Sequence, residues 1–301
     1  MLRSLLDSAG LRPRKRLGQC FLIDRNLMNK LADAAEIGPS DCVLEVGCGT
    51  GSLTALLAAR AGRVVAAEVD PDLAKIAHRQ LAAYQNVRFL CVDALKSKST
   101  VAPEVVDAVQ EGRQGACGKA SRAVLGPGRL RLKLVANLPY DIATPLIIDL
   151  LLGGLPFVRY CFTVQQEVAE RFLAEPNGQA FGPVAVMAQA LTRGRRVAKV
   201  SPQAFWPEPK VSSAMLCLDA RPPEQVRVTE PAAFAEFVRA FFRFRRKTMS
   251  HIARTLDMAE WVLPALASLG ISPRARPQNV AVDQWVSLHR ACGCHQTVEG
   301  I

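Results

Sequence analysis

Short, continuous apolar runs alternate with stretches in which apolar residues recur every three or four positions between residues 24 and 174. Continuous apolar runs are typical of strands buried on both faces of a sheet, and the wider spacing is typical of helices that pack on it. The alternation therefore predicts an α/β fold with a parallel sheet covered by helices on both faces. We expect strands over residues 42–46, 64–69, 87–92, 132–136 and 157–164, and helices over residues 24–35, 52–61, 145–152 and 166–174, with a further helix starting at Asp70-Pro71.

The later part of the chain has a different pattern, which predicts a second domain. Two more strands are expected at 195–200 and 212–218, on either side of a proline-rich loop. Arg221-Pro222-Pro223 has the composition of a linker, and the remainder is patterned for helices. We therefore place a first domain at 1–220 and a smaller helical domain at 221–301. Residues 96–131 are rich in Gly, Ser, Lys, Arg and Ala, with one possible helix near 103–110, and we interpret them as a surface insertion.

Polar residues or glycine stand at the end of several predicted strands. Gly47 follows the first strand, Glu68 closes the second, Asp93 follows the third and Asn137 follows the fourth. Right-handed crossovers bring the carboxyl ends of parallel strands to one edge of the sheet, where ligands of α/β proteins bind. These four positions predict a site at that edge.

The loop Glu45-Val46-Gly47-Cys48-Gly49-Thr50-Gly51 lets backbone approach a ligand closely and exposes the N–H groups of the next helix. Its Gly-x-Gly-x-Gly spacing differs from the Gly-x-Gly-x-x-Gly of dinucleotide sites. S-adenosylmethionine sites share such a loop. An acid such as Glu68 accepts ribose hydroxyls in both kinds of site, and Asp93 is placed to accept an adenine amino group. These residues alone leave both ligands open.

The segment Asn137-Leu138-Pro139-Tyr140 discriminates between them. Carbonyl acceptors on Asn137 and Leu138, beside a Tyr140 ring, suit a planar ligand with an exocyclic amine. The amine of adenine is a poor nucleophile, so orienting it and stabilising its developing charge would serve methyl transfer without a strong base. An adenine in RNA must also be unstacked between aromatic rings, and Phe205 is the candidate for the second face. The simpler alternatives are an Asn-Pro turn at this segment and core packing of Phe205 beside Trp206.

The chain has 38 Lys and Arg against 27 Asp and Glu, a formal net charge of +11. This excess predicts a polyanionic partner, and nucleic acid is favoured over membrane because no basic amphipathic anchor is present. Basic residues concentrate at 193–199 and at 239–247, where phenylalanines are interleaved. Such clusters are typical of phosphate contacts and base stacking, although solvated helix faces also carry them.

No apolar run approaches the roughly 18 to 20 residues of a membrane span, and the N-terminus lacks a signal-peptide core. The nine cysteines are scattered without a disulfide-like framework. We therefore expect a cytoplasmic protein with reduced thiols. His289, Cys292, Cys294 and His295 cluster near the C-terminus, but they lack the paired C-x₂-C spacing of structural zinc sites, so no metal is expected.

Together these motifs resemble the KsgA-type ribosomal RNA adenine dimethyltransferases over nearly the whole chain. The segments that carry the resemblance are residues 15–22, 44–51, 68–70, 93–94, 137–140, 144–146, 165–171, 176–177, 186–189, 205–211 and 245–248. Only the glycine loop is widely shared among other families.

The resemblance implies a Rossmann-like, seven-stranded S-adenosylmethionine-dependent methyltransferase with a small helical domain that helps to dock the ribosomal particle. It implies dimethylation of the N6 amines of two adjacent adenosines in a hairpin near the 3′ end of small-subunit ribosomal RNA. The partner would be the immature small subunit, and the protein would act as a monomer. The implied cofactor-binding residues are Gln19, Cys20, Leu22, Gly47, Gly49, Glu68, Asp93, Ala94 and Asn137. The implied catalytic residues are Asn137, Leu138, Pro139, Tyr140 and Phe205.

The chain departs from the family pattern at three places. Cys20 stands where an asparagine is usual, Gln166 where a lysine is usual, and the 96–131 segment is longer. One alternative function is an RNA-binding ribosome assembly factor with weak or no catalysis. Another is a large-subunit ribosomal RNA adenine methyltransferase that confers antibiotic resistance, although Leu138, the Phe205 loop and residues 245–248 favour the small-subunit type.

Overall fold

The computed structural model describes residues 5–7, 10–14, 17–97, 100–114 and 129–296, the last four by backbone only. The chain divides into two compact units, which are described separately. One comprises Met1–Ala169 with Arg195–Ala220, and the other comprises Glu170–Gly194 with Arg221–Ile301. The chain passes from the first unit to the second between Ala220 and Arg221, where the domain boundary was expected. Residues 170–194, which were expected in the first domain, group with the helical unit.

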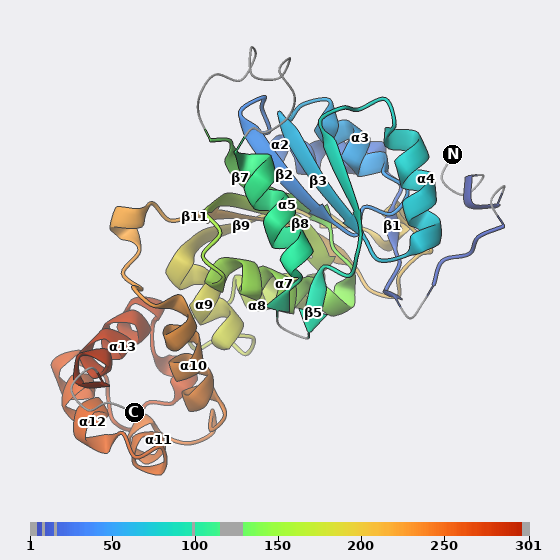
Figure 1. Ribbon diagram of the computed structural model, residues 1–301. Coiled ribbons are helices and arrows are strands. Elements are labelled where there is room, and N and C mark those ends of the chain that lie inside the picture. The colour runs from blue at the N-terminus through green and yellow to red at the C-terminus, as the bar shows by residue number, and fades with distance from the viewer. Residues whose placement is uncertain (1–4, 8–9, 15–16, 98–99, 115–128, 297–301) are drawn as a thin grey trace. The chain divides into compact units, whose positions relative to one another are not determined.

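A seven-stranded sheet forms the centre of the first unit, with the order β4-β3-β2-β7-β8-β11-β9 (Figure 1). The parallel neighbours β4, β3, β2, β7 and β8 are followed by β11, which runs antiparallel to β8. This confirms the predicted α/β class. The strands are β2 Asp41–Val46, β3 Arg63–Glu68, β4 Val87–Cys91, β7 Arg131–Asn137, β8 Phe157–Gln165, β9 Thr192–Val200 and β11 Ser213–Ala220.

Helices cover both faces of this sheet. One face shares a continuous apolar core with α2 (Arg25–Ala34), α3 (Ser52–Ala58) and α4 (Pro71–Leu81). Figure 1 shows α5 (Pro103–Arg113) and α7 (Tyr140–Leu152) on the face turned toward the viewer. The apolar runs of the sequence belong to strands because both of their faces are buried in this way.

The 96–131 segment was interpreted as a surface insertion, and the structure differs for its first half. The helix expected near 103–110 is α5, which packs on β2 and β3 and buries Val105, Ala108 and Val109 almost completely. It is therefore a core helix of the fold. Short strands β5 (Leu95–Ser97) and β6 (Thr100–Val101) precede it. Residues 115–128 of the expected insertion lie outside the described residues.

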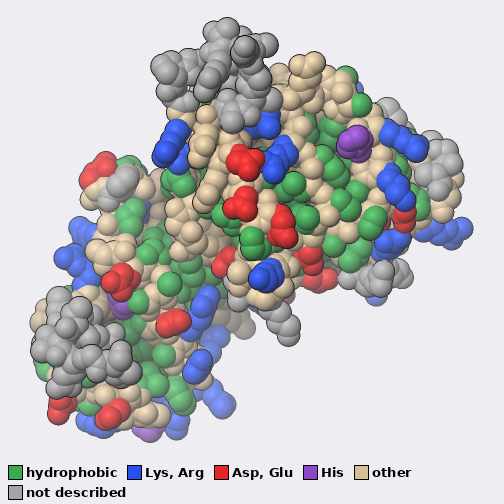
Figure 2. All heavy atoms as spheres, viewed as in Figure 1, with side chains coloured by type: hydrophobic (Ala, Val, Ile, Leu, Met, Phe, Trp, Pro, Cys, Tyr) green, Lys and Arg blue, Asp and Glu red, His purple; other side chains and the backbone are tan. Residues whose placement is uncertain are grey.

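The exposed side of α5 is acidic. Glu104, Asp107 and Glu111 are exposed on it, and Figure 2 shows acidic side chains gathered over this helix. A face of this charge repels nucleic acid, so an RNA is expected to approach the first unit elsewhere.

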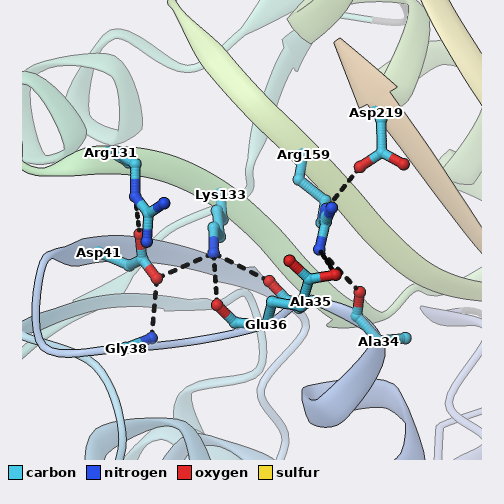
Figure 3. A network of polar contacts seen from close by, with 9 residues as sticks. All are labelled: Ala34, Ala35, Glu36, Gly38, Asp41, Arg131, Lys133, Arg159 and Asp219. Carbon is cyan, nitrogen blue, oxygen red and sulfur yellow. Dashed lines mark hydrogen bonds and ion pairs between the residues drawn. The ribbon is translucent and has the colours of Figure 1, made fainter.

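A buried ion pair ties α2 to the opposite edge of the sheet from the predicted site (Figure 3). Lys133 of β7 lies 2.9 Å from Asp41 of β2, and neither residue is more than 3% exposed. The Lys133 ammonium also donates to the backbone carbonyls of Ala35 and Glu36, at 3.0 and 2.7 Å. It therefore satisfies carbonyls at the C-terminal end of α2, where a cation is favoured.

The second unit is a helical bundle around an aromatic core. Its helices are α9 Pro183–Leu191, α10 Pro231–Phe242, α11 Met249–Thr255, α12 Ala259–Ser268 and α13 Val282–Gln296, with the short turns η3 Pro223–Gln225 and η4 Pro277–Asn279. Trp285 is fully buried and packs against Phe237, Phe241 and Phe242. No helix among the described residues is long and apolar enough to cross a bilayer.

The basic cluster at 239–247 belongs to this unit. Its Arg and Lys side chains are exposed, whereas Phe241 and Phe242 face the core and Phe244 is half-buried. The interleaved rings of Phe241 and Phe242 thus hold the helix in place instead of stacking on bases. The cluster therefore presents positive charge to solvent, without those two rings. The exposed members are Arg239, Arg243, Arg245, Arg246 and Lys247.

Candidate active site

A pocket opens at the carboxyl ends of β2, β3, β4 and β7, with about 550 Å³ of empty space when the part open to solvent is included. The structure brings together here the four rim positions singled out in the sequence, namely Gly47, Glu68, Asp93 and Asn137. Of the other expected ligand-contact residues, Gln19, Cys20, Ala94 and Pro139 also line it.

Two expected cofactor residues lie outside this pocket. Leu22 is 7% exposed and lines a smaller hollow, which shares Asn137 with this pocket. Gly49 is absent from the lining of both, but its N–H donates to Glu68 at 2.7 Å. Gly49 therefore acts on the pocket through the carboxylate that it holds.

The glycine loop is shaped by close packing. Gly47 has φ +74°, and a Cβ there would lie 3.0 Å from the Pro139 ring. Gly49 has φ +59°, and its Cβ would lie 2.9 Å from the Phe21 ring. Other residues are strained at such φ values and would collide with these rings. The loop after β2 thus packs against both the segment after β7 and the segment before α2.

The Glu68 carboxylate is held in place by backbone. One oxygen accepts from Gly49, and the other accepts from Asp70 N–H at 2.9 Å. Burial raises the pKa of Glu68, and these hydrogen bonds oppose the rise. A carboxylate has about four lone-pair sites, so the group keeps acceptor capacity for a hydroxyl of a ligand.

Asn137 has one paired and one unpaired end. Its NH₂ donates to the backbone carbonyl of Cys20 at 2.9 Å. Its side-chain oxygen is buried and has no hydrogen-bond partner among the described residues. Buried acceptors in native proteins nearly always have a donor. The vacant acceptor therefore marks where an N–H group of a ligand would bind.

The contact with Asn137 uses the backbone of residue 20, so the identity of its side chain matters little to it. We expect Cys20→Ala to change the KM for the methyl donor by less than about threefold, because the carbonyl is retained. Steady-state kinetics, with Cys91→Ala as a control at an exposed cysteine outside the pocket, would test this. A tenfold rise in KM for Cys20→Ala alone would show that the thiol itself contacts the ligand.

The aromatic residues at the site are arranged differently from the expectation. Tyr140 opens α7, and its hydroxyl lies 2.7 Å from that of Ser213. Phe205 is only 2% exposed and belongs to the apolar core, as the core-packing alternative required. Trp206 instead stacks on Phe21, with ring centroids 6.5 Å apart. The first three expected catalytic positions, Asn137 to Pro139, end β7 and lead into α7, and the Leu138 side chain is 1% exposed.

The stacked pair comes from a long-range strand pairing. β1 (Phe21–Leu22) pairs antiparallel with β10 (Phe205–Trp206), which follows the turn η2 (Pro202–Ala204). Phe21 also lines the pocket. Sequence reasoning missed Phe21, although its place directly after Gln19-Cys20 was a usable signal.

Glu45 is a second residue that sequence reasoning left without a role. Its carboxyl is buried between the sheet and α3, and one oxygen has no partner among the described residues. Burial raises the pKa of Glu45 to about 8; the nearby Thr54 hydroxyl opposes the rise, and the nearby Glu68 charge adds to it. Glu45 lines the smaller hollow beside Asn137.

The raised pKa of Glu45 predicts a pH-dependent stability. The unfolded side chain titrates near ~4.3, so between about pH 4.5 and 8 the folded protein holds a proton that the unfolded chain has lost. The contribution of this group is therefore favourable at low pH and is lost as the pH rises toward 8. Glu45→Gln should be increasingly stabilising relative to the parent from pH 5 to pH 8 in urea unfolding. A difference that stays constant with pH would contradict the assignment.

The C-terminal His/Cys cluster lies on α13 in the second unit. His289 packs its ring against Phe234 and Phe237, and burial lowers its pKa. Cys292 is buried. The side chains of Cys294 and His295 lie outside the described residues. Among the side chains that the structure does describe, no three His, Cys, Asp or Glu are grouped as metal ligands.

The fold has close counterparts among solved structures. A dimethyladenosine transferase from Plasmodium falciparum has a TM-score of 0.70 at 24% identity, over 89% of this chain and 95% of that one. The 23S rRNA methyltransferase ErmE has a TM-score of 0.64 at 25% identity, over 91% and 99% of the two chains. The sheet, its glycine loop and the acidic residues at its edge define a Rossmann-like S-adenosylmethionine-dependent methyltransferase.

The sequence comparisons give the family. The model of the ribosomal RNA adenine dimethylase family matches residues 10–292, and the chain belongs to that family. A protein of Moorella thermoacetica named Ribosomal RNA small subunit methyltransferase A is 38% identical over 291 residues, 95% of each chain. One of the same name from Pediococcus pentosaceus is 35% identical over 292 residues, covering 95% of this chain and 92% of the relative. The protein is therefore an enzyme that dimethylates adenine in ribosomal RNA with S-adenosylmethionine.

The pocket fits this cofactor better than a dinucleotide. Among the described residues, those that line the pocket include the carboxylates of Glu68 and Asp93 and no lysine or arginine. Two acids without a basic residue suit a sulfonium cation with a ribose and an adenine, whereas a pyrophosphate would meet repulsion there.

Proposed function

We propose that this enzyme dimethylates the N6 amines of two adjacent adenosines in a hairpin near the 3′ end of small-subunit ribosomal RNA. The observation that carries the proposal is the buried, unpaired oxygen of Asn137 beside a pocket lined by Glu68 and Asp93. The names of the curated relatives support the small subunit as the source of the RNA.

In this proposal the cofactor supplies an electrophilic methyl group on a sulfonium. Glu68 accepts the ribose hydroxyls, Asp93 accepts the amino group of the cofactor's adenine, and the loop at Gly47 supports the methionine end. These three roles are supported by two observations. Glu68, Asp93 and Gly47 all line one pocket, and the Glu68 carboxylate is already oriented by two backbone donors.

The target adenine is held by acceptors on the segment after β7. The Asn137 oxygen and the Leu138 carbonyl accept its N–H groups, so that the nitrogen lone pair points toward the methyl group. Developing positive charge on the nitrogen is stabilised by the same acceptors, and no strong base is needed. Tyr140 stacks on one face of the base, with its ring anchored by Ser213. The loop that carries Phe205 closes the other face, and Phe205 anchors this loop from the core.

The RNA is held by basic residues that do not line the pocket. On the first unit, exposed Arg195, Arg196 and Lys199 lie along β9, an edge strand of the sheet. On the second unit, the basic cluster at 239–247 offers further phosphate contacts. We infer that the second unit, which carries this exposed basic cluster, docks the immature small subunit, and that the enzyme acts in the cytoplasm as a monomer.

The proposal is tested by incubating the protein with labelled S-adenosylmethionine and either immature small or large ribosomal subunits. We expect label in small-subunit RNA and primer-extension stops at two adjacent adenosines. Label in large-subunit RNA instead would identify a large-subunit enzyme. Binding to small subunits without label would identify an assembly factor, and either result would overturn the proposal.

A further inference from the structure

The segment that leads into β1 forms one wall of the pocket and is fastened to α4. Gly18, Gln19 and Cys20 line the pocket. Gln19 was expected to face the cofactor, but its amide is used within the protein. Its oxygen accepts from the Arg14 backbone N–H at 2.7 Å, and its NH₂ donates to Asp70 at 2.9 Å.

Arg14 completes this attachment with its guanidinium. One of its NH₂ groups lies 3.0 Å from Asp70, and the other donates to Asp72 at 2.7 Å. The Asp70 side chain is 4% exposed, whereas those of Arg14 and Asp72 are 35% and 37% exposed. A buried carboxylate needs its partners, because losing one leaves a charge without compensation. The interaction is therefore stronger than an ordinary surface ion pair.

Asp70 connects this attachment to the ligand-binding carboxylate. It caps α4 by accepting from Asp72 N–H at 3.1 Å, and its own N–H donates to Glu68. On the same wall, Cys20 lies one residue beyond Gln19, and its carbonyl accepts from the NH₂ of Asn137. A continuous path of polar contacts thus runs from Arg14 to Glu68, and the same wall orients Asn137.

We propose that Arg14 and Gln19 are positioning residues, which fasten residues 17–20 to α4 and thereby hold the cofactor wall in its binding geometry. The contacts among Arg14, Gln19, Asp70 and Asp72 form what we call the latch. The inference rests on the proposed placement of the cofactor in this pocket. The latch itself contacts the pocket only through Gln19, so its effect is expected on cofactor affinity more than on the chemical step.

Arg14 is also part of a basic arm, so a direct contact with RNA phosphate must be separated from the latch. Asp72 allows this separation. Arg14→Ala removes a positive charge, and Asp72→Ala removes a negative one, but both open the same ion pair. A latch predicts that both substitutions weaken cofactor binding. A phosphate contact predicts that they shift RNA affinity in opposite directions and leave cofactor affinity unchanged.

The test measures the Kd for S-adenosylmethionine by calorimetry without RNA, and then the KM for RNA and kcat at saturating cofactor. We expect Arg14→Ala and Asp72→Ala each to raise the Kd about five- to tenfold, with kcat within about twofold. Arg14→Lys should recover part of the affinity, because an ammonium reaches only one carboxylate at a time. Arg60→Ala, which breaks a surface pair between Asp33 of α2 and the turn after α3, is the matched control and should leave the Kd unchanged.

An unchanged Kd in both Arg14→Ala and Asp72→Ala would overturn the latch, as would a similar loss in Arg60→Ala. Thermal unfolding of each variant checks that the fold is retained, and Asp72→Ala gives a second reading if Arg14→Ala is poorly folded. The binding measurement needs no methyl transfer. A wild-type protein that binds the cofactor but labels the wrong RNA would refute the proposed function and leave the latch standing.

Discussion

Asn137→Ala is expected to lower kcat for methyl transfer about a thousandfold while leaving RNA affinity within a few fold. The substitution removes the buried, unpaired oxygen that we assign to the target amine. It also removes the donor that holds the Cys20 carbonyl, so a moderate rise in the KM for S-adenosylmethionine should accompany the loss. RNA affinity should persist, because exposed basic residues outside the pocket supply most of it. Single-turnover kinetics and filter binding with the same RNA particle measure the two quantities.

Two further variants sharpen this experiment. Asn137→Asp keeps an acceptor toward the amine but loses the donor to Cys20, so it should retain more activity than Asn137→Ala. Asn86→Ala removes an asparagine that donates to the carbonyls of Ala58 and Ala61, outside the pocket, and should keep kcat near that of the parent. Equal loss of catalysis and RNA binding in Asn137→Ala would contradict the role given to its oxygen.

Lys133→Met is expected to lower the free energy of unfolding by about 3 kcal/mol. The ammonium is buried and pairs with Asp41, and it also satisfies two carbonyls at the end of α2 (Figure 3). Methionine fills a similar volume but leaves the buried carboxylate with fewer partners. Urea unfolding followed by circular dichroism measures the change.

The same carboxylate provides the control. Arg131 also pairs with Asp41, at 2.9 Å, but its side chain is 58% exposed. Arg131→Ala should therefore cost less than about 1 kcal/mol. Adding Asp41→Asn to Lys133→Met should recover part of the loss, because no buried charge is then left unpaired. Similar losses for Lys133→Met and Arg131→Ala would show that burial of the pair contributes nothing.

The sheet and its helices were predictable because their signals are local. Five strands expected from continuous apolar runs, such as those at 42–46 and 157–164, begin and end within a residue or two of the observed ones. The helix expected at 145–152 instead starts at Tyr140, with Pro145 inside it. Proline is tolerated near the start of a helix, so its position indicated the helix but not its first residue.

The short strand pairing at the pocket was not predictable. β1 and β10 contain two residues each and join positions about 185 apart in the sequence. Neither has an apolar run long enough to indicate a strand. Their pairing places Phe205 in the core and Trp206 on Phe21, so it decides which aromatic rings can meet a base.

The burial of the segment at 103–113 was also not predictable from its sequence. Its composition and its glycine-rich continuation indicated a surface insertion, yet α5 covers the sheet. An apolar sheet face must be covered by another element, usually a helix. Whether a given helix is buried therefore depends on the strands beneath it and cannot be read from the helix's own sequence.

The sequence by itself determined the parallel α/β fold, the edge at which the site lies, and the residue types at that edge: Gly47, Glu68, Asp93 and Asn137. These follow from apolar periodicity and from the rule that parallel strands end together, both of which are properties of neighbouring residues. Only the tertiary structure decided how the polar side chains are used. It assigns Gln19 to Asp70, the Cys20 carbonyl to Asn137, and Lys133 to Asp41, pairs that lie 51, 117 and 92 positions apart. A polar side chain has no period that reveals its partner, because the partner is whatever the packed elements bring within hydrogen-bond distance.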